Sequence, residues 1–292
     1  MKDRMRAGSA VAFRTAEERR APGVLIDAVT VRFGGLVALD GITLRIPPGE
    51  TVGLVGPNGS GKTTLINAIC GLVPITAGSI CIGDQDVSRR PAVARISLGV
   101  VRTFQSLAVL ADLTVMENVM LGAELARSRS IGGSPQLRAR SALRVLGIER
   151  YANELGGNLP TGMARRVELA RSLVLRPEVL LLDEFTSGLD HRETQALVTV
   201  VRRLTASSRI TTLVVEHDLD VVVSMCQRLF VLSAGSVMAE GTPREVLTQP
   251  EVVAAYVGDT FAAQLALREI DHGEPQLQEQ ALTPRTQVGE DL

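Results

Sequence analysis

Apolar and polar residues alternate at the beginning of the chain, which is the pattern of half-buried β-strands. The alternation predicts strands over Val24–Phe33 and Ile42–Ile46. Thr51–Val55 is short, apolar and β-branched, as expected of a buried strand. After a glycine-rich segment, apolar residues recur at helical spacing from Leu65 to Leu72, and this helix is predicted to end at Gly71 or just beyond.

The second half of the chain alternates short apolar runs with amphipathic segments. Helices are predicted at Val167–Val174, Thr194–Leu204 and Leu219–Cys226, strands at Val179–Leu182 and Thr211–Val215, and a terminal hairpin at Leu229–Leu232 and Ser236–Ala239. Strands that alternate with helices imply a mostly parallel sheet covered on both faces, so the predicted fold class is α/β.

The middle of the chain, about residues 106–163, has a different pattern. Thr114–Leu121 and Leu137–Leu146 have helical periodicity, and between them Ser128–Ser134 is a loop of Ser, Gly and Arg. We expect a small helical subdomain inserted into the α/β framework.

Both ends of the chain differ in composition from the region between them. Residues 1–22 carry six basic and three acidic side chains, and residues 259–292 carry two basic and seven acidic ones. The tail is rich in Gln, Glu and Pro, although residues 261–270 could form a short amphipathic helix. We therefore expect one body over residues 23–258 between two flexible segments, whose roles the sequence leaves open.

The composition of the 292 residues excludes several classes of protein. A net charge of −1 argues against a nucleic-acid-binding protein that relies on bulk positive charge. No run of 18 apolar residues is present, so no transmembrane helix is expected, and the first ten residues lack the apolar core of a secretion signal. Three scattered cysteines form no disulfide framework, which favours a reducing cytoplasm.

The segment Gly56–Thr63 has the pattern G-x-x-x-x-G-K-T between a predicted strand and a predicted helix. In this context backbone N–H groups converge on phosphate oxygens, and the helix N-terminus adds positive potential. Lys62 would reach the β- and γ-phosphates, and the Thr63 hydroxyl would ligate Mg²⁺. The candidate phosphate-binding residues are Gly56, Pro57, Asn58, Gly59, Ser60, Gly61, Lys62, Thr63 and Thr64.

The apolar run Val179–Leu182 ends in two carboxylates, Asp183 and Glu184. Ligands of open α/β sheets bind at the carboxyl ends of the strands. Asp183 is the candidate magnesium ligand, acting through water, and Glu184 is the candidate general base that polarises the attacking water. Such a pair alone could be a solvated strand end, but after a phosphate-binding loop it points to nucleotide hydrolysis.

The body of the chain, roughly Val24–Gly258, resembles the ATPases of the ATP-binding cassette (ABC) family. The segment Arg102–Gln105 is similar to the family's Q-loop, and residues 183–190 are similar to its Walker B and D-loop motifs. His217, which follows a predicted strand, matches the switch histidine, and Phe33 matches the aromatic residue that stacks on adenine. For Phe33, a place in the hydrophobic core is the alternative.

The resemblance implies a RecA-like P-loop ATPase core with an N-terminal antiparallel β region and the inserted α-helical subdomain. It also implies ATP and Mg²⁺ as cofactors, and a head-to-tail dimer in which each nucleotide lies between two chains. By resemblance, the catalytic residues are Glu184, His217 and Gln105, the metal ligands are Thr63, Gln105 and Asp183, and the nucleotide contacts include Phe33, Gly162 and Asp190.

Further segments are similar to the ATP-binding subunits of bacterial branched-chain amino acid importers. They are Arg102–Gln105, Thr114–Val119, Leu159–Gly162, Val215–Asp218, Ala239–Pro243, Pro250–Val252 and Tyr256–Gly258. The implied partners are transmembrane permease subunits, a second ATP-binding subunit (identical or different), and a separate periplasmic or extracellular solute-binding protein. The chain would then be peripheral on the cytoplasmic face of the membrane, and no nucleic acid is expected to bind. Other amino acids, amides and urea-like solutes stay open as cargo.

Two motifs depart from the family pattern. The signature, usually Leu-Ser-Gly-Gly-Gln, reads Leu159–Met163 here with the sequence LPTGM, and Phe185 replaces the usual proline. Pro160 has neither a hydroxyl nor an N–H to donate to a γ-phosphate, whereas Gly162 still offers its N–H. An ATP site built with this signature is expected to turn over more slowly, and equal turnover at both sites of the dimer is the alternative.

Two other classes of function compete with transport. Soluble cassette proteins that act on nucleic acid or ribosomes usually carry two cassettes or a long coiled-coil insertion, and this chain has neither. A regulatory module that binds nucleotide without hydrolysing it is disfavoured because Glu184 and His217 are both present.

Overall fold

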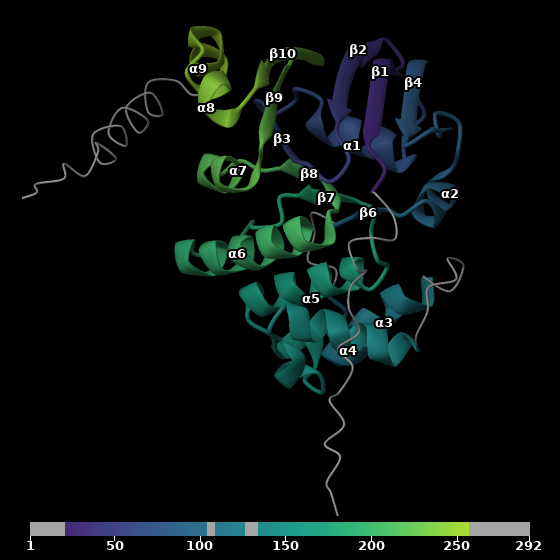
Figure 1. Ribbon diagram of the computed structural model, residues 1–292, viewed down its shortest axis with the longest axis vertical. Coiled ribbons are helices and arrows are strands. Elements are labelled where there is room, and N and C mark those ends of the chain that lie inside the picture. Colours follow the sequence, from purple (N-terminus) through teal and green to yellow (C-terminus); the bar gives the residue numbers. More distant parts are fainter. Residues whose placement is uncertain (1–20, 104–108, 126–133, 257–292) are drawn as a thin grey trace, which may run out of the picture. The chain divides into compact units, whose positions relative to one another are not determined.

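Two β-sheets form the framework of the chain, of which the computed structural model describes residues 21–103, 109–125 and 134–256 (Figure 1). The first sheet is antiparallel with the strand order β2-β1-β4-β5. Its strands are β1 (Val24–Phe33), β2 (Leu36–Ile46), β4 (Ala77–Ile82) and β5 (Gln85–Asp86). Along β1 the apolar residues Val24 and Ile26 are buried and their neighbours are exposed, as the alternation predicts. The N-terminal antiparallel β region is therefore confirmed.

The second sheet is mostly parallel, with the strand order β10-β9-β3-β8-β7-β6. Its strands are β3 (Thr51–Val55), β6 (Val100–Arg102), β7 (Val179–Asp183), β8 (Thr211–Val215), β9 (Arg228–Ser233) and β10 (Ser236–Gly241). Every residue of β3, β7 and β8 is buried, which explains why these strands are nearly continuous apolar runs. Strands β9 and β10 form the predicted terminal hairpin, and the α/β fold class is confirmed.

Helix α1 (Lys62–Cys70) packs into the core that both sheets share. Its buried apolar residues belong to one cluster with Ile26 of β1 and Leu213 of β8. The helix ends at Cys70, and Gly71 after it adopts the left-handed conformation common after a helix C-terminus. The strand, the glycine-rich loop and the helix of the predicted phosphate-binding motif therefore follow one another in the expected order.

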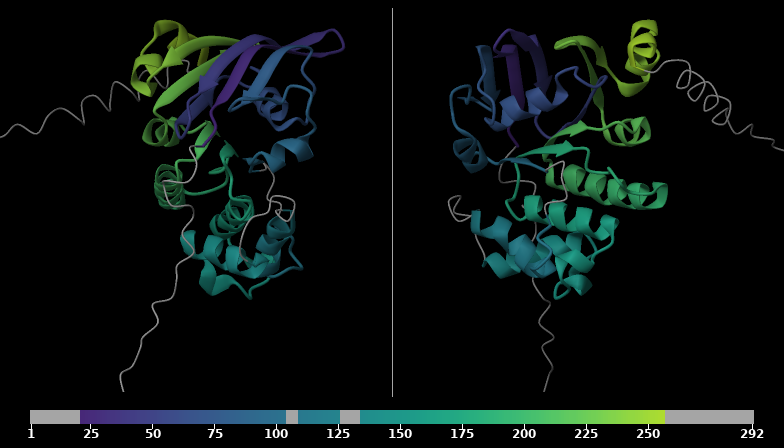
Figure 2. Two further views of the ribbon diagram at one scale, coloured as in Figure 1. Left: turned by 45° about the vertical axis from the view of Figure 1, so that its right-hand side comes forward. Right: turned by 180° about the vertical axis from the view of Figure 1, so that it is seen from behind.

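Helices α3 (Val115–Leu125) and α4 (Pro135–Val145) lie within the predicted helical insertion, and α5 (Thr161–Leu173) packs against both. They pack on one another and are seen together in both views of Figure 2. The remaining helices are α2 (Ala92–Ser97), α6 (His191–Ser208), α7 (Leu219–Met225), α8 (Pro243–Leu247) and α9 (Pro250–Tyr256), with short 3₁₀ turns at Glu149–Tyr151 and Gly156–Asn158. No helix within the described ranges is long and apolar enough to cross a membrane.

Some predicted boundaries differ from the structure, and some short elements are not predicted. Helix α5 begins at Thr161, six residues before the predicted start at Val167, because its polar first turns are buried by tertiary packing rather than by an apolar stripe. The pattern also does not predict β4, β5, α2 or β6, and a strand of three residues is too short to show a period. The expected helix at 261–270 and most of the loop at 128–134 lie outside the described residues, and the proposed domain limits stay predictions.

Arg95 of α2 caps the C-terminal end of α1 by donating hydrogen bonds to its carbonyl groups. The residue is 2% exposed, and its guanidinium donates to the carbonyl oxygens of Ala68 at 2.6 Å, Ile69 at 2.9 Å and Arg90 at 3.0 Å. A cation at this end of a helix satisfies carbonyl groups and complements the helix dipole. This contact anchors the helix that follows the phosphate-binding loop.

We expect Arg95→Met to lower the free energy of unfolding by about 3 kcal/mol, because it leaves buried carbonyl oxygens without a donor. The matched control is Arg90→Met, whose exposed side chain donates to Gln85 at 3.0 Å, and which is expected to cost less than about 0.5 kcal/mol. Urea denaturation of both full-length variants measures the difference. Equal losses would show that the contact of Arg95 with α1 is unimportant for stability.

Candidate active site

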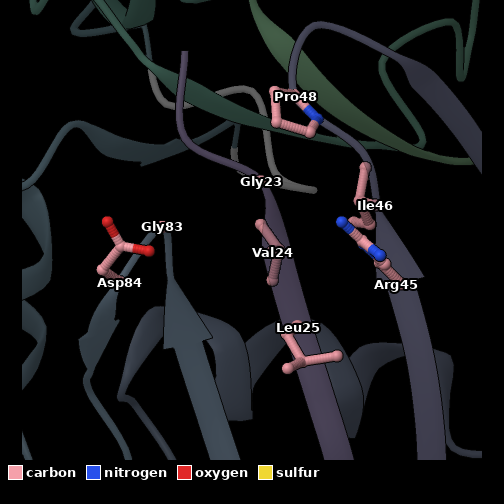
Figure 3. A pocket seen from close by; sticks show the side chains of 8 residues that line it. All are labelled: Gly23, Val24, Leu25, Arg45, Ile46, Pro48, Gly83 and Asp84. Carbon is pink, nitrogen blue, oxygen red and sulfur yellow. The ribbon is translucent and has the colours of Figure 1, made fainter. Parts of the chain in front are cut away.

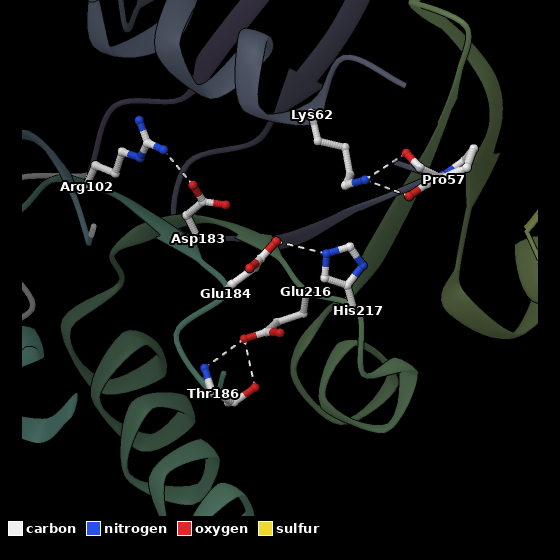
Figure 4. Close-up of polar contacts among 9 residues, drawn as sticks. Pro57, Lys62, Arg102, Asp183, Glu184, Thr186, Glu216 and His217 are labelled. Atoms are coloured by element: carbon white, nitrogen blue, oxygen red, sulfur yellow. Dashed lines mark hydrogen bonds and ion pairs between the residues drawn. The ribbon is translucent and has the colours of Figure 1, made fainter. Parts of the chain in front are cut away.

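Three strand ends meet at one edge of the parallel sheet. Leu54 of β3 and Asp183 of β7 are both in register with Val215 of β8, the strand between them. The segments that follow these strands therefore lie side by side: the glycine-rich loop after β3, Glu184 after β7 and His217 after β8 (Figure 4). This edge is where ligands of open α/β sheets bind.

The loop between β3 and α1 requires glycine at both ends. Gly56 has a φ of +152°, and a Cβ there would lie 2.2 Å from the carbonyl oxygen of Leu232. Gly61 has a φ of +107° at the N-cap of α1, and a Cβ there would lie 2.7 Å from the side chain of Leu39. Residues 57–60 are thereby held as a tight turn before the helix N-terminus, where backbone N–H groups can meet an anion.

Lys62 is buried and folded back onto this loop. Its Nζ donates to the carbonyl oxygen of Gly56 at 2.6 Å and to that of Pro57 at 3.0 Å. Burial lowers the pKa of Lys62, and the negative charges of Glu184 and Asp183 partly oppose that shift. The ammonium group can exchange its two carbonyl acceptors for phosphate oxygens with little movement of its stem.

Asp183 is 1% exposed and is paired through only one of its oxygens. Oδ2 accepts a hydrogen bond from Nη2 of Arg102 at 2.6 Å. Oδ1 is buried and has no hydrogen-bond partner among the described residues, and the same holds for the hydroxyl of Ser60. Because buried polar atoms are rarely left unpaired, these two oxygens fit contacts with a nucleotide and its hydrated Mg²⁺.

Glu184 has a left-handed backbone with a φ of +48°, which is uncommon for a residue other than glycine. Its N–H donates to the carbonyl oxygen of Val215 at 2.8 Å, which holds the turn after β7. The side chain thereby reaches His217, with Oε1 lying 2.8 Å from Nε2. Their side chains are 24% and 50% exposed, so water reaches both. A strained residue that pairs a carboxylate with an imidazole in contact with water is suited to proton transfer.

Glu216 connects the segment after β8 to the segment after β7. It is 3% exposed and accepts hydrogen bonds from the N–H and the hydroxyl of Thr186, both at 2.9 Å. Burial raises the pKa of Glu216, although the hydrogen bonds from Thr186 act in the opposite direction. The residue before His217 is thus tied to the second residue after Glu184.

None of Thr63, Thr64 and Phe33 is fully buried. Thr63 is exposed and Thr64 is half-buried in the first turn of α1. Phe33 is 50% exposed at the end of β1, so the alternative of a core position is wrong. Gln105 lies outside the described residues, and its roles in catalysis and metal binding stay predictions.

Gly162 and Asp190 lie together at a second place. Asp190 caps α6 by accepting from the N–H of Glu193 at 2.7 Å, and the Glu193 carboxylate accepts from the N–H of Asp190 at 3.3 Å. A Cβ on Gly162 would lie 2.5 Å from Oε1 of Glu193, so the N-termini of α5 and α6 adjoin. Within the described ranges, no hydrogen bond or ion pair links Gly162 or Asp190 to Lys62 or Asp183.

Three polar residues of the site were not predicted: Arg102, Asn67 and Glu216. The signal for Arg102 is a cation at the end of a strand that pairs with β7, but β6 itself was not predicted. Asn67 lies on the expected helix and accepts from Nη1 of Arg102 at 2.6 Å. Residue type alone does not distinguish these side chains from exposed polar ones, because their role depends on long-range contacts.

A shallow pocket lies elsewhere, between the ends of β1 and β2 and the turn after β4 (Figure 3). Leu25, Arg45 and Asp84 are among its lining residues, and all three are exposed. None of the predicted nucleotide-binding or catalytic residues lines it. The candidate active site is therefore the edge of the parallel sheet and not this pocket.

The fold and the site define a P-loop ATPase, and comparison with known proteins narrows the class. The family model of ABC transporters matches residues 39–187. A second family model, described as a branched-chain amino acid ATP-binding cassette transporter, matches residues 236–262. The chain belongs to the ABC transporter family and is an ATPase subunit of a transporter.

Individual relatives agree with this assignment. The chain is 34% identical over 251 residues to the high-affinity branched-chain amino acid transport ATP-binding protein LivG of Escherichia coli (strain K12), covering 82% of this chain and 98% of LivG. It is 33% identical over 268 residues to the Fe(3+) ions import ATP-binding protein FbpC of Brucella abortus (strain 2308), covering 91% and 74%.

Two solved structures share the fold. The ADP conformation of MJ1267, an ATP-binding cassette of an ABC transporter, has a TM-score of 0.74 and 29% identity, covering 82% of this chain and 99% of that one. The dimeric structure of MJ0796, a bacterial ABC transporter cassette, has a TM-score of 0.67 and 28% identity, covering 76% and 99%. These findings confirm the predicted family, the RecA-like fold class and the ATPase activity.

The buried carboxyl group of Glu216 leads us to expect a pH dependence of stability. Burial raises the pKa of Glu216 in the folded chain above the ordinary value of 4.5. The contribution of Glu216 to the free energy of unfolding is therefore fully present below pH 4.5 and is lost as the pH rises through the pKa of the folded chain. Glu216→Gln keeps an oxygen acceptor for Thr186 and removes the charge. Its free energy of unfolding should therefore fall less than that of the wild type as the pH rises above 4.5.

Urea denaturation at a series of pH values measures this difference. The control is Glu216→Leu, which also removes the acceptor and is expected to be about 2 kcal/mol less stable than Glu216→Gln. Parallel curves of stability against pH for the wild type and Glu216→Gln would refute the assignment of a raised pKa to this residue.

Proposed function

We propose that this chain is the ATP-hydrolysing subunit of an ABC importer that energises the uptake of branched-chain amino acids. ATP hydrolysis is supported by the cluster of Lys62, Asp183, Glu184 and His217 at one edge of the parallel sheet. The solute is supported by the second family model and by LivG. FbpC, a relative of similar identity, is named for iron import, so the choice of solute rests on the relatives and not on this site.

Each predicted residue has a proposed role in nucleotide binding. Gly56, Pro57, Asn58, Gly59, Ser60, Gly61, Lys62, Thr63 and Thr64 surround the phosphates, Phe33 stacks on adenine, and Thr63, Gln105 and Asp183 hold Mg²⁺. The exposed ring of Phe33 supports its role, since a stacking residue must be accessible. Mg²⁺, when bound, neutralises charge that develops on the phosphate oxygens.

The proposed hydrolysis uses the Glu184–His217 pair. Glu184 accepts a proton from a water molecule whose oxygen attacks the γ-phosphorus, and the bond from the γ-phosphorus to the bridging oxygen breaks to leave ADP and phosphate. His217 holds the carboxylate from the adjacent strand at 2.8 Å. Lys62, once released from its carbonyl acceptors, stabilises negative charge on the phosphates.

The proposed assembly is a head-to-tail dimer in which Gly162 and Asp190 face the nucleotide of the partner subunit. This arrangement is supported by the lack of hydrogen bonds from these two residues to Lys62 or Asp183 within the described ranges, and by similarity to a dimeric cassette. In the proposed assembly the chain lies on the cytoplasmic face of the membrane, bound to permease subunits that receive solute from a separate solute-binding protein. No nucleic-acid partner is proposed.

Replacement of the base tests hydrolysis directly. Glu184→Gln removes the proton acceptor and should lower steady-state ATPase turnover of the assembled transporter by about 10²–10⁴-fold while nucleotide binding is retained. Lys62→Ala, in contrast, removes the cation that faces the phosphates and should weaken binding itself. Turnover by Glu184→Gln at the wild-type rate would remove this residue from the catalytic role.

The departing signature predicts unequal ATP sites if the partner subunit is a different chain. Glu184→Gln alone should abolish most activity, because it disables the site that combines this chain's Walker residues with the partner's signature. The matching change in the partner should cost less, because that site relies on Pro160 and Gly162, and each lost charge-assisted hydrogen bond weakens closure by about 1.5–3 kcal/mol. Equal loss from either change would contradict the asymmetry, as would an assembly that contains only two copies of this chain.

The transport role is tested in cells of the source organism that lack this chain. Uptake of radiolabelled leucine should be restored by the wild type and not by Glu184→Gln expressed at the same level. In a matched assay, uptake of ferric iron should be the same whether the cells express the wild type, Glu184→Gln or neither. Leucine uptake that does not depend on the chain would refute the proposed solute, while the ATPase assay would still stand on its own.

A further inference from the structure

Arg102 connects three elements of the candidate active site. It is the last residue of β6, its Nη2 donates to Oδ2 of Asp183 at the end of β7, and its Nη1 donates to Oδ1 of Asn67 on α1. Both contacts are 2.6 Å long. Figure 4 shows the guanidinium on one side of Asp183, with Lys62 and His217 on the other side.

The pair of Arg102 and Asp183 is buried, since the two side chains are 10% and 1% exposed. Removing two charges from water is costly, and replacing such a pair by apolar residues is often neutral or stabilising. A simple stability role therefore does not explain why a charged pair stands at this point of the sheet. Its geometry leaves Oδ1 of Asp183 as the oxygen without a partner among the described residues, which is the atom available to a metal-bound water.

The geometry points to Arg102 as a positioning residue for the metal site: it holds the Asp183 carboxylate in one orientation, and Asn67 holds Arg102. This inference rests on the proposed role of Asp183 in binding Mg²⁺. Through Asn67, the position of the carboxylate is tied to the helix that carries Lys62 and Thr63, so both halves of the metal site share one support.

The planar guanidinium suits this position better than an ammonium group. Arg102 uses two separate nitrogens for two acceptors on different elements, and a lysine would place a single charged point at the end of a flexible stem. Arg102→Lys therefore keeps the charge and loses the fixed orientation. Asn67→Ala keeps both charges and removes one support of the guanidinium.

The test compares binding of ADP to the full-length chain in the presence of Mg²⁺ and in EDTA, measured by isothermal titration calorimetry. The readout is the ratio of the ADP affinity with Mg²⁺ to the ADP affinity in EDTA, which is the gain that Mg²⁺ provides. Loss of a partner that orients a metal ligand typically costs about 10–100-fold, so Arg102→Met should reduce the gain by that factor. Arg102→Lys and Asn67→Ala should each reduce it by about threefold to tenfold, and affinity in EDTA should not change.

Two matched variants separate this inference from the proposed function. Arg95→Met removes another buried arginine that contacts α1, but its acceptors are backbone carbonyls, so the gain from Mg²⁺ should stay at the wild-type value. Asp183→Asn removes the proposed ligand itself. If it leaves the gain intact, the metal role of Asp183 fails and the inference fails with it.

If Asp183→Asn abolishes the gain while Arg102→Lys and Asn67→Ala keep it at the wild-type value, the inference about Arg102 alone is wrong. The same conclusion follows if Arg102→Met and Arg95→Met lower the gain equally, since that would indicate general loss of structure. Should Arg102→Met not fold, the other two variants still decide, because each keeps a donor or a charge beside Asp183.

Discussion

Val215 pairs with Leu54 on one side and with Asp183 on the other, and all fifteen residues of the three strands concerned are buried. Asp183 is itself 1% exposed, so a shift of β7 by one residue would separate this buried carboxylate from Arg102 and leave it unpaired, which is costly. The register of these strands is therefore strongly specified by burial. It places the phosphate-binding loop, the two carboxylates and the histidine at one edge of the sheet.

Burial also explains the electrostatic pattern of the site. Lys62, Arg102, Asp183 and Glu216 are charged or polar groups with little exposure, and each is held by a hydrogen bond from or to a neighbouring segment. Such groups are costly to bury unless they are paired, and their partners fix their orientation. Glu184 and His217 differ, since they are open to solvent, as residues that handle a water molecule must be.

Much of this arrangement could be predicted from the sequence, because local patterns carry it. The glycine-rich loop is required by backbone geometry at Gly56 and Gly61, and the apolar run before Asp183 is required by a buried parallel strand. The terminal hairpin and the helical insertion follow from periodicity in the same way. These features depend on residues that are neighbours in the chain.

What the sequence did not reveal depends on distant pairs. Strand β6 is too short to show a period, and without it Arg102 could not be placed beside Asp183, 81 positions further along the chain. The first turns of α5 are polar, so periodicity indicates a helix only from Val167 onward, although Gly162 and Arg165 are buried in those turns. In each case, tertiary packing overrides a weak local signal.

A crystal structure of the full-length chain with ADP and Mn²⁺ in place of Mg²⁺, in which anomalous scattering locates the metal, tests directly where nucleotide and metal bind. We expect the phosphates over the backbone N–H groups of residues 58–64. The metal should lie about 2.1 Å from the Thr63 hydroxyl and one water molecule away from Oδ1 of Asp183, with Oδ2 still bound by Arg102. Phosphates bound elsewhere, or a metal without Thr63 and Asp183 near it, would contradict the proposal that the meeting of these three strand ends forms the catalytic site.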